Sequence, residues 1–326
     1  MSKMSRYPHG FASGAVIRNM PIGDGAPGKV FWVGNNSTLL EGEKAAADAN
    51  LNDKGGGFLS PFSTLDYAIG QCKASRGDMI YIRPGYAQSM TSATAVVCDV
   101  AGVQIVGLGK GSKRAKFTYD HADGLFTISA ANVHIENLWF VPSVTAVTKA
   151  ILISAAGDDY EIVGCRFADA EAAGTDEFNR TIMHAATVQR GLIKDCHIDM
   201  GEAGAITGIE VATPEEILIE DCKIVGDYST ACISNITASG ASMHVHRNIL
   251  INGVKSGLNA VAAIVNVAGN ELILSDNYIG SDVATFALMI TNYTGGVNLG
   301  NRYTDDIGGA TTAADRSASV IVSADS

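Results

Sequence analysis

This sequence has few charged residues and few prolines. Asp, Glu, Lys and Arg make up 17% of its 326 residues, and 7 prolines stand beside 36 glycines. Apolar residues make up 47%, which is enough for a packed core and unlike the composition of a disordered chain. Many glycines with few prolines favour a fold that repeats tight turns many times. The length suits one elongated repeat domain with an additional arm.

Several features that define other protein classes are absent. No apolar run is long enough to span a membrane, and the N-terminus lacks a continuous apolar stretch, so we expect neither a membrane protein nor a secretory signal. The six cysteines have no zinc-binding spacing, which predicts reduced thiols, no metal and no cofactor. The net charge is -11 and the lysines and arginines are scattered, so we expect no nucleic acid partner.

A six-residue pattern recurs along most of the chain. Its clearest copy is Ile219–Ile224, which has an apolar residue first, a small residue fourth and an apolar residue sixth. We number these positions one to six. Successive fourth positions lie 24 to 31 residues apart, and self-similarity at such a period indicates stacked supersecondary units. The fourth positions are Leu108, Leu138, Cys165, Cys196, Cys222, Asn248, Asn277 and Asn301.

A second short segment, rich in β-branched residues, precedes most copies of the pattern. Examples are Ala150–Ile153 and Gly208–Val211. Small and polar residues separate this segment from the copy that follows, so each repeat is typical of a strand, a tight turn and a strand. The stretches between copies have no sustained helical periodicity. We therefore predict an all-β fold, a right-handed parallel β-helix of about eight coils, because crossover connections favour that hand.

The β-helix prediction also explains the residues at the fourth position. Stacking places equivalent side chains of successive coils above one another, about 4.8 Å apart. The fourth positions would then form an internal column, in which cysteines serve as small buried apolar groups. The asparagines would hydrogen-bond along the column. We interpret all of these residues as structural.

The predicted organisation is an extended arm and linker over residues 1–57 and a β-helix domain over residues 58–326. The arm is rich in glycine and proline but keeps apolar residues, which indicates docking onto a partner or, equally, a simple lead-in strand. These apolar residues are Phe11, Val16, Ile17, Met20 and Ile22.

Both ends of the β-helix domain require a cover, because an open coil exposes apolar side chains and unpaired strand edges. Residues 63–74 predict a capping helix with Leu65, Ile69 and Cys72 on one face and Ser63 as its N-cap. At the other end, residues 319–323 are typical of the first strand of an unfinished coil. We expect a partner, or the segment 305–316, to cover it.

The start of the predicted domain resembles a known superfamily. Residues 60–69, followed by Arg76–Gly85, are similar to the capping helix and first strand of pectin-lyase-like β-helix proteins. The segments Arg6–Phe11 and Gly28–Val33 also resemble tailed-bacteriophage virion proteins of this type. The resemblance implies a structural virion protein, a capsid decoration or head-appendage protein that attaches through its arm to the major capsid protein or another virion protein. We expect a homotrimer, made in the host cytoplasm and located in the virion.

The superfamily also includes polysaccharide lyases and hydrolases, which implies an alternative: a tail spike or fibre that binds or depolymerises a host polysaccharide. Paired carboxylates divide the acid and base roles in the hydrolases. Asp158 and Asp159 form a candidate pair, but no partner motif follows them, so we interpret them as turn residues. Asp195 and Asp221 share the third position and are expected to face solvent. We predict no catalytic residues.

The longest interruption between copies, residues 168–180, predicts a loop that projects from the stack, where solenoid proteins often bind ligands. Its acids would face a host glycan, and they are Asp169, Glu171, Asp176 and Glu177. Two features remain open. His244 and His246 would project from one strand and could bind a metal ion in a trimer. Trp139 and Tyr278 would lie on the outer surface, where aromatic rings suit either sugar stacking or a subunit interface.

Overall fold

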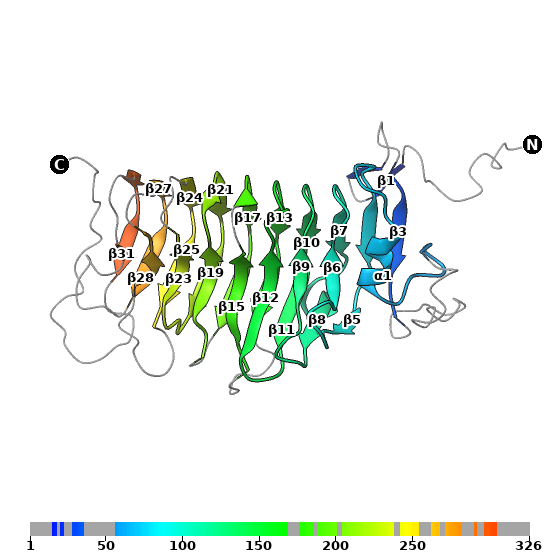
Figure 1. The fold of residues 1–326 in the computed structure, drawn as a ribbon, viewed down its shortest axis with the longest axis horizontal. Helices are drawn as coiled ribbons and strands as arrows, with labels where there is room; N and C mark the ends of the chain where they lie inside the picture. Colours follow the sequence, from blue (N-terminus) through cyan, green and yellow to red (C-terminus); the bar gives the residue numbers. More distant parts are fainter. Residues whose placement is uncertain are drawn as a thin grey trace, which may run out of the picture.

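The computed structural model of the chain describes residues 15–17, 20–22, 28–35, 56–168, 176–185, 188–200, 204–237, 242–253, 262–267, 271–281, 290–291 and 297–304. Most of these residues form an elongated stack of short strands that advances from the N-terminal to the C-terminal end of the chain (Figure 1). The predicted all-β fold, a right-handed parallel β-helix, is confirmed.

Three parallel sheets form the walls of the β-helix, and we call them sheets 1, 2 and 3 in the order in which the chain passes them. Sheet 3 has eight strands, so eight coils are complete, as predicted. Sheet 1 contains β3 (Val30–Val33), β4 (Met79–Ile82), β7 (Gln104–Gly107), β10 (His134–Glu136), β13 (Glu161–Val163), β17 (Leu192–Lys194), β21 (Ile217–Glu220), β24 (Ser242–His246), β27 (Glu271–Ser275) and β30 (Val297–Leu299). Sheet 2 contains β5 (Ala87–Ser89), β8 (Ala115–Tyr119), β11 (Leu138–Pro142), β14 (Arg166–Ala168), β18 (His197–Met200), β22 (Lys223–Gly226), β25 (Ile249–Asn252), β28 (Tyr278–Ser281) and β31 (Arg302–Thr304). Sheet 3 contains β6 (Val96–Cys98), β9 (Phe126–Ile128), β12 (Val147–Ile153), β15 (Phe178–His184), β19 (Thr207–Val211), β23 (Ala231–Asn235), β26 (Ile264–Val265) and β29 (Ile290–Thr291).

Each coil has one strand more than the sequence predicted, because the six-residue pattern is not a single strand. In the copy Ile219–Ile224, β21 ends at Glu220 and β22 begins at Lys223. Between them, Asp221 has a φ of 54°, in the left-handed region. The chain therefore turns a corner at position three and passes from sheet 1 to sheet 2.

Position three adopts this left-handed conformation in seven successive copies. Such a φ is least costly for glycine, and asparagine and aspartate reach it more readily than other residues. The residues and their φ angles are Asn137 (59°), Gly164 (60°), Asp195 (52°), Asp221 (54°), Arg247 (52°), Asp276 (56°) and Gly300 (65°). The left-handed backbone conformation thus explains why aspartate occupies positions 195 and 221. The sequence prediction gave solvent exposure alone and did not include this conformation.

The fourth positions from Leu138 onward form the predicted internal column, and its asparagines join successive coils. The Asn277 side chain donates to the carbonyl of Val245 and to Oδ1 of Asn301, at 2.8 Å each. Its own Oδ1 accepts the backbone N–H of Asn248 at 2.8 Å. One amide therefore satisfies backbone groups of the preceding coil and a side chain of the following coil.

The cysteines of the column make the same kinds of contact with longer distances. The Sγ atom of Cys222 lies 3.4 Å from the backbone nitrogen of Cys196 and 3.6 Å from the carbonyl oxygen of Ile193. Cys196 and Cys222 are each 2% exposed. The cysteines are buried as predicted, but they also serve as weak substitutes for the asparagine amides, because a thiol is both a weak donor and a weak acceptor.

Leu108 does not belong to this column. The residue that pairs with Leu138 is Ala115, and Leu108 is partly exposed. Residues 109–114, which include the 3-10 helix Gly111–Lys113, are inserted between β7 and β8. The insertion displaces the fourth position, so the prediction for this copy was wrong.

The cap at the N-terminal end is smaller than predicted. Helix α1 (Leu65–Gly70) has six residues, and its N-cap is Thr64, which makes no side-chain capping bond. The prediction of a helix over residues 63–74 with Ser63 as N-cap was therefore wrong, although Leu65 and Ile69 are buried as expected. No helix in the described part of the chain has the length and apolarity needed to cross a bilayer.

Strand β3 lies within the predicted arm and linker, yet it pairs in parallel with β4 and begins sheet 1. The lead-in strand that the sequence left open is thus present at residues 30–33. The predicted strand at residues 319–323 and the segment 305–316 lie outside the described residues.

We expect Asn277→Ala to lower the free energy of unfolding by about 2–4 kcal/mol, because it leaves the Asn248 N–H and the Val245 carbonyl buried without these partners. Urea unfolding measures the change. Gln104→Ala removes an exposed amide from β7 and serves as the control. If both variants lost an equally small part of the free energy of unfolding, the proposed contribution of the asparagine hydrogen bonds to stability would be contradicted.

A buried histidine predicts how stability depends on pH. Burial lowers the pKa of His184 to about 3, and the Tyr160 hydroxyl lies 2.7 Å from its Nε2 atom. The unfolded chain binds a proton near pH 6.5, whereas the folded chain does not until about pH 3, so stability falls as pH decreases through this range. Each pH unit costs about 1.4 kcal/mol. Urea titrations of wild type and His184→Gln at several pH values should show a shallower decrease in the variant, and parallel curves would contradict the assignment.

Candidate anion-binding site

The apolar arm residues predicted to contact a partner are only partly described. Val16 and Ile17 lie in β1 (Ala15–Ile17), and Met20 and Ile22 lie in β2 (Met20–Ile22). The two strands pair in an antiparallel sheet of their own. Phe11 and the side chains of the other four residues lie outside the described structure.

The acidic loop predicted to face a glycan is also only partly described. Asp169 and Glu171 lie outside the described residues, and Asp176 is half-buried. Glu177 is 2% exposed, and its Oε2 accepts the backbone N–H of Ala205 at 2.7 Å. The carboxylate of Glu177 therefore joins neighbouring coils and is not presented to solvent.

The acids that were weighed as a catalytic pair are turn residues. Asp159 has a φ of 55° and lies 2.6 Å from Nε of Arg190 in the next coil. That arginine holds the pKa of Asp159 below its usual value. Asp158 accepts the backbone N–H of Gln189 at 2.8 Å. Both carboxylates thus connect two coils, as the interpretation of turn residues requires.

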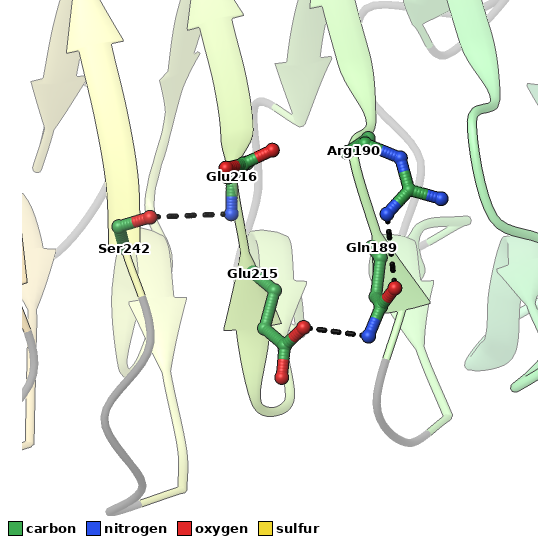
Figure 2. A pocket seen from close by; sticks show the side chains of 5 residues that line it. All are labelled: Gln189, Arg190, Glu215, Glu216 and Ser242. Carbon is green, nitrogen blue, oxygen red and sulfur yellow. Dashed lines mark hydrogen bonds between the residues drawn. The ribbon is translucent and has the colours of Figure 1, made fainter.

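A hollow of about 260 Å³ lies beside these turns and is lined by polar side chains (Figure 2). Gln189 donates to Glu215 at 2.6 Å, and Arg190 donates to Gln189 at 2.9 Å. The backbone N–H of Glu216 donates to Ser242 at 3.3 Å. Because the lining groups bond to one another, the hollow offers a ligand few unused polar atoms.

His244 and His246 project from the outer face of β24, as predicted. Both rings contact the hydroxyl of Ser275, at 2.9 Å from His244 Nε2 and 2.6 Å from His246 Nδ1. Among the described residues, no group of three or more His, Cys, Asp or Glu side chains is placed to hold a metal ion. The two histidines therefore form a hydrogen-bonded cluster on the surface. The described residues provide no third ligand beside them for a metal ion.

A different face of the molecule has the charge pattern of a binding site. Five residues in the first outward position of successive sheet 2 strands stack in register on β8, β11, β14, β18 and β22. We call them the cationic row. They are Lys116, Trp139, Arg166, His197 and Lys223. The same position continues as Ile249, Tyr278 and Arg302.

The core beneath the row holds it in place. Side chains alternate across a strand, so the residue after each member of the row points inward. Phe117, Phe140 and Phe167 are the first three of these, and their rings stack at centroid distances of 5.7 and 4.9 Å. The Cα positions of the row are therefore fixed by a packed aromatic column.

No residue of the cationic row forms an ion pair within the described structure. Several cations elsewhere pair with acids of neighbouring coils, as in Lys194–Glu220 at 2.6 Å and Arg247–Asp221 at 2.7 Å. Among the strands that carry the row, the acid is Asp199 of β18, which acts on His197 through space but bonds to none of the row. The three permanent cations of the row thus lie on alternate strands without an acidic partner among the described residues. In a chain with eleven more acidic than basic residues, this arrangement points to an external anion.

Trp139 keeps two of the cations apart and in place. The Lys116 ammonium lies 5.9 Å from the ring centroid and the Arg166 guanidinium 5.1 Å from it, one from the coil before and one from the coil after. Such cation–π contacts stabilise the charges by about 0.5–1 kcal/mol each at exposed sites. Since both faces of the indole are occupied, Trp139 does not offer a free face for a sugar. Tyr278, in contrast, is 41% exposed.

The nitrogens of this face are poorly satisfied by the protein itself. Nε of Arg114, Nε1 of Trp139, Nε of Arg166 and Nε2 of His197 are buried and have no hydrogen-bond partner among the described residues. Burial lowers the pKa of His197, and Lys223, Arg166 and Arg114 lower it further, against the opposing effect of Asp199. The ring is therefore neutral at neutral pH, between two permanent cations.

The sequence analysis missed the cationic row. Its members lie 23 to 31 residues apart, so the basic residues looked scattered along the chain. The signal was present one position after each fourth position, where Trp139, Arg166, His197 and Lys223 follow Leu138 and the three cysteines of the column. The basic residues that are scattered in the sequence are thus brought into one row on this face of the molecule.

Comparisons with known proteins add little beyond the fold. No protein-family profile matches the chain, and the search of curated proteins gives no match. Among solved structures, the chain is similar to a rhamnogalacturonan lyase with a TM-score of 0.47 and 12% identity, over 79% of this chain and 75% of that chain. We take the class of the protein, a right-handed parallel β-helix, from its own strand pairing, and take no activity from this likeness.

Proposed function

We propose that this protein is a β-helix that binds an acidic polysaccharide along the cationic row. The observation that carries the proposal is the stacked row itself: among the described residues no acid bonds to Lys116, Arg166 or Lys223, whereas Arg190, Lys194 and Arg247 each pair with an acid of a neighbouring coil. Carboxylates of a uronic acid suit these groups, because arginine binds a carboxylate through two parallel hydrogen bonds. The open outer face of a sheet accommodates a long chain without a closed pocket.

Two features favour a glycan over a nucleic acid. Proteins that bind single strands stack bases on free aromatic faces, and both faces of Trp139 are covered by cations. The net charge of -11 also repels a polymer with a charge on every unit. A polysaccharide with fewer charges per length is less strongly repelled by the rest of the molecule.

The proposed role is binding and not cleavage. Glycoside hydrolysis uses two carboxylates on either side of the scissile bond. The strands that carry the row contain one acid, Asp199, which lies two residues after His197 on β18. We therefore assign the row the task of holding a glycan, which matches the binding form of the tail-spike alternative.

Attachment to a virion through the arm stands beside this role as a second candidate. Strands β1 and β2 form a two-stranded sheet that shares no strand pairing with the three walls of the β-helix. An isolated two-stranded hairpin is marginally stable in water and needs a packing partner. We propose that the major capsid protein or another virion protein supplies this partner, that three copies assemble, and that the β-helix then displays the cationic row to a host glycan.

Binding of the glycan is tested with polymeric hyaluronate and polygalacturonate, with neutral dextran as the uncharged polymer. We expect Lys116→Ala/Arg166→Ala/Lys223→Ala to lower affinity for the acidic polymers by at least about tenfold, since each lost charged contact is worth about 1.5–3 kcal/mol in favourable geometry. Affinity should also fall as salt rises, because exposed charges are screened beyond about 10 Å at 0.1 M salt. Isothermal titration calorimetry measures both effects.

The control removes three other cations, in Lys29→Ala/Lys73→Ala/Lys149→Ala, and so changes the net charge equally. It should retain most of the wild-type affinity. Equal losses in both triple variants would show that only overall charge matters, and no binding of either acidic polymer by wild type would refute the proposed function.

The arm is tested by removing residues 1–27. The truncated protein should keep its melting temperature, because β3 and the coils remain, but should lose binding to virus particles from the source. Sedimentation of both proteins reports whether three copies assemble. Loss of folding in the truncated chain would place the arm in the core, and unchanged attachment would sink the second candidate.

A further inference from the structure

The cations of the row do not occupy every coil but every second coil. Lys116, Arg166 and Lys223 lie on β8, β14 and β22, and an aromatic ring occupies each intervening strand. Trp139 is on β11 and His197 on β18. Neighbouring strands are about 4.8 Å apart, so successive cations are separated by about 9.6 Å, and the three span about 19 Å.

This spacing is held by contacts and is not left to flexible side chains alone. Lys116 and Arg166 rest on the two faces of Trp139, and the stems of such long side chains pack on apolar surface while their charged ends face water. All three strands follow the same internal aromatic and aliphatic column, because residues 117, 167 and 224 are buried. The charges are thus offered at a fixed period.

Resting on the proposed function, we infer that the row selects an acidic glycan in which charged and neutral sugars alternate. Two sugar rings of an extended chain cover about the distance of two coils, so one uronic acid per disaccharide would place a carboxylate at each cation. The neutral sugars would then lie at the levels of Trp139 and His197, between successive cations. A polyuronate, with a carboxylate on every sugar, would place half of its charges against these rings, where no permanent cation receives them.

The inference can be tested because it predicts the opposite order of affinities from that expected for attraction by total charge alone. A hexasaccharide of alternating glucuronic acid and N-acetylglucosamine carries half the charge of hexagalacturonate. Attraction by charge alone would favour hexagalacturonate. We expect the alternating hexasaccharide to bind at least about tenfold more tightly, the effect of one well-placed charged contact. Calorimetry with both oligosaccharides, and with neutral cellohexaose as reference, decides between them.

A variant can move one charge without changing the total. Arg166→Ala/His197→Lys shifts a cation by one coil along the row and so breaks the two-coil period. We expect it to lose the preference for the alternating hexasaccharide. Arg166→Lys keeps the period and should keep the preference, and circular dichroism with thermal unfolding checks that both variants fold.

The outcomes separate this inference from the proposed function. Tighter binding of hexagalacturonate, or equal binding of the two acidic oligosaccharides, would overturn the alternating pattern while leaving acidic glycan binding in place. An unchanged preference in Arg166→Ala/His197→Lys would overturn the role of the two-coil period. Binding of neither acidic oligosaccharide would overturn both the inference and the function on which it rests.

Discussion

Hydrogen bonding between successive coils in strict register is the constraint on which the whole structure depends. Every strand of the three walls pairs in parallel with the strand one coil before and one coil after it, except the strands at the two ends of each sheet. Register then turns each sequence position into a column of side chains along the axis. A column must be chemically self-consistent, because each member contacts a copy of itself or a close substitute. The asparagine column meets this demand with amides that donate and accept at once, and the cysteine column meets it with weaker thiol contacts.

The outer columns of charged residues differ between sheets 1 and 2. On sheet 1, Lys194 meets Glu220, and at the adjoining turn Arg247 meets Asp221, so opposite charges alternate from coil to coil. On sheet 2, the row from Lys116 to Lys223 contains no acid and separates its charges with rings. A face on which several stacked cations have no acidic partner among the described residues is where function is expected. The proposed glycan site therefore rests on a contrast within one molecule.

Sequence reasoning recovered the parts of the fold that depend on periodicity. The parallel β-helix, its eight coils and the buried fourth positions from Leu138 to Asn301 follow from a repeat that apolar and small residues preserve. It failed where the period is interrupted, at Leu108, because an insertion cannot be distinguished from a degraded copy without the pairing. At position three it predicted solvent exposure, which Asp195 shows, but it missed the left-handed corner, because the preference of Asp221 for that region is invisible when the pattern is taken as one strand.

The candidate site could not be predicted for a related reason. Lys116 and Lys223 are far apart in the sequence, and only the stacked coils bring them into one line. In the sequence, Arg166 and Lys223 look like scattered surface charges. Only the folded structure shows that neither pairs with an acid among the described residues. In contrast, the acids of the loop before β15 looked like a site in sequence, but Glu177 proved to be a buried link between coils.

The left-handed corner at position three has an evolutionary consequence. Each coil from β10 onward contains its own bend, made by its own asparagine, aspartate, glycine or arginine, so such a coil is a complete unit that can be duplicated or deleted without redesigning its neighbours. The inward residues would still meet equivalent residues after such an event. The outer face would not be preserved, because inserting or removing a single coil reverses the phase of everything beyond it. Lineages of such a protein would therefore conserve their core while changing what they recognise, and the parity of the coil number would be a heritable trait in its own right.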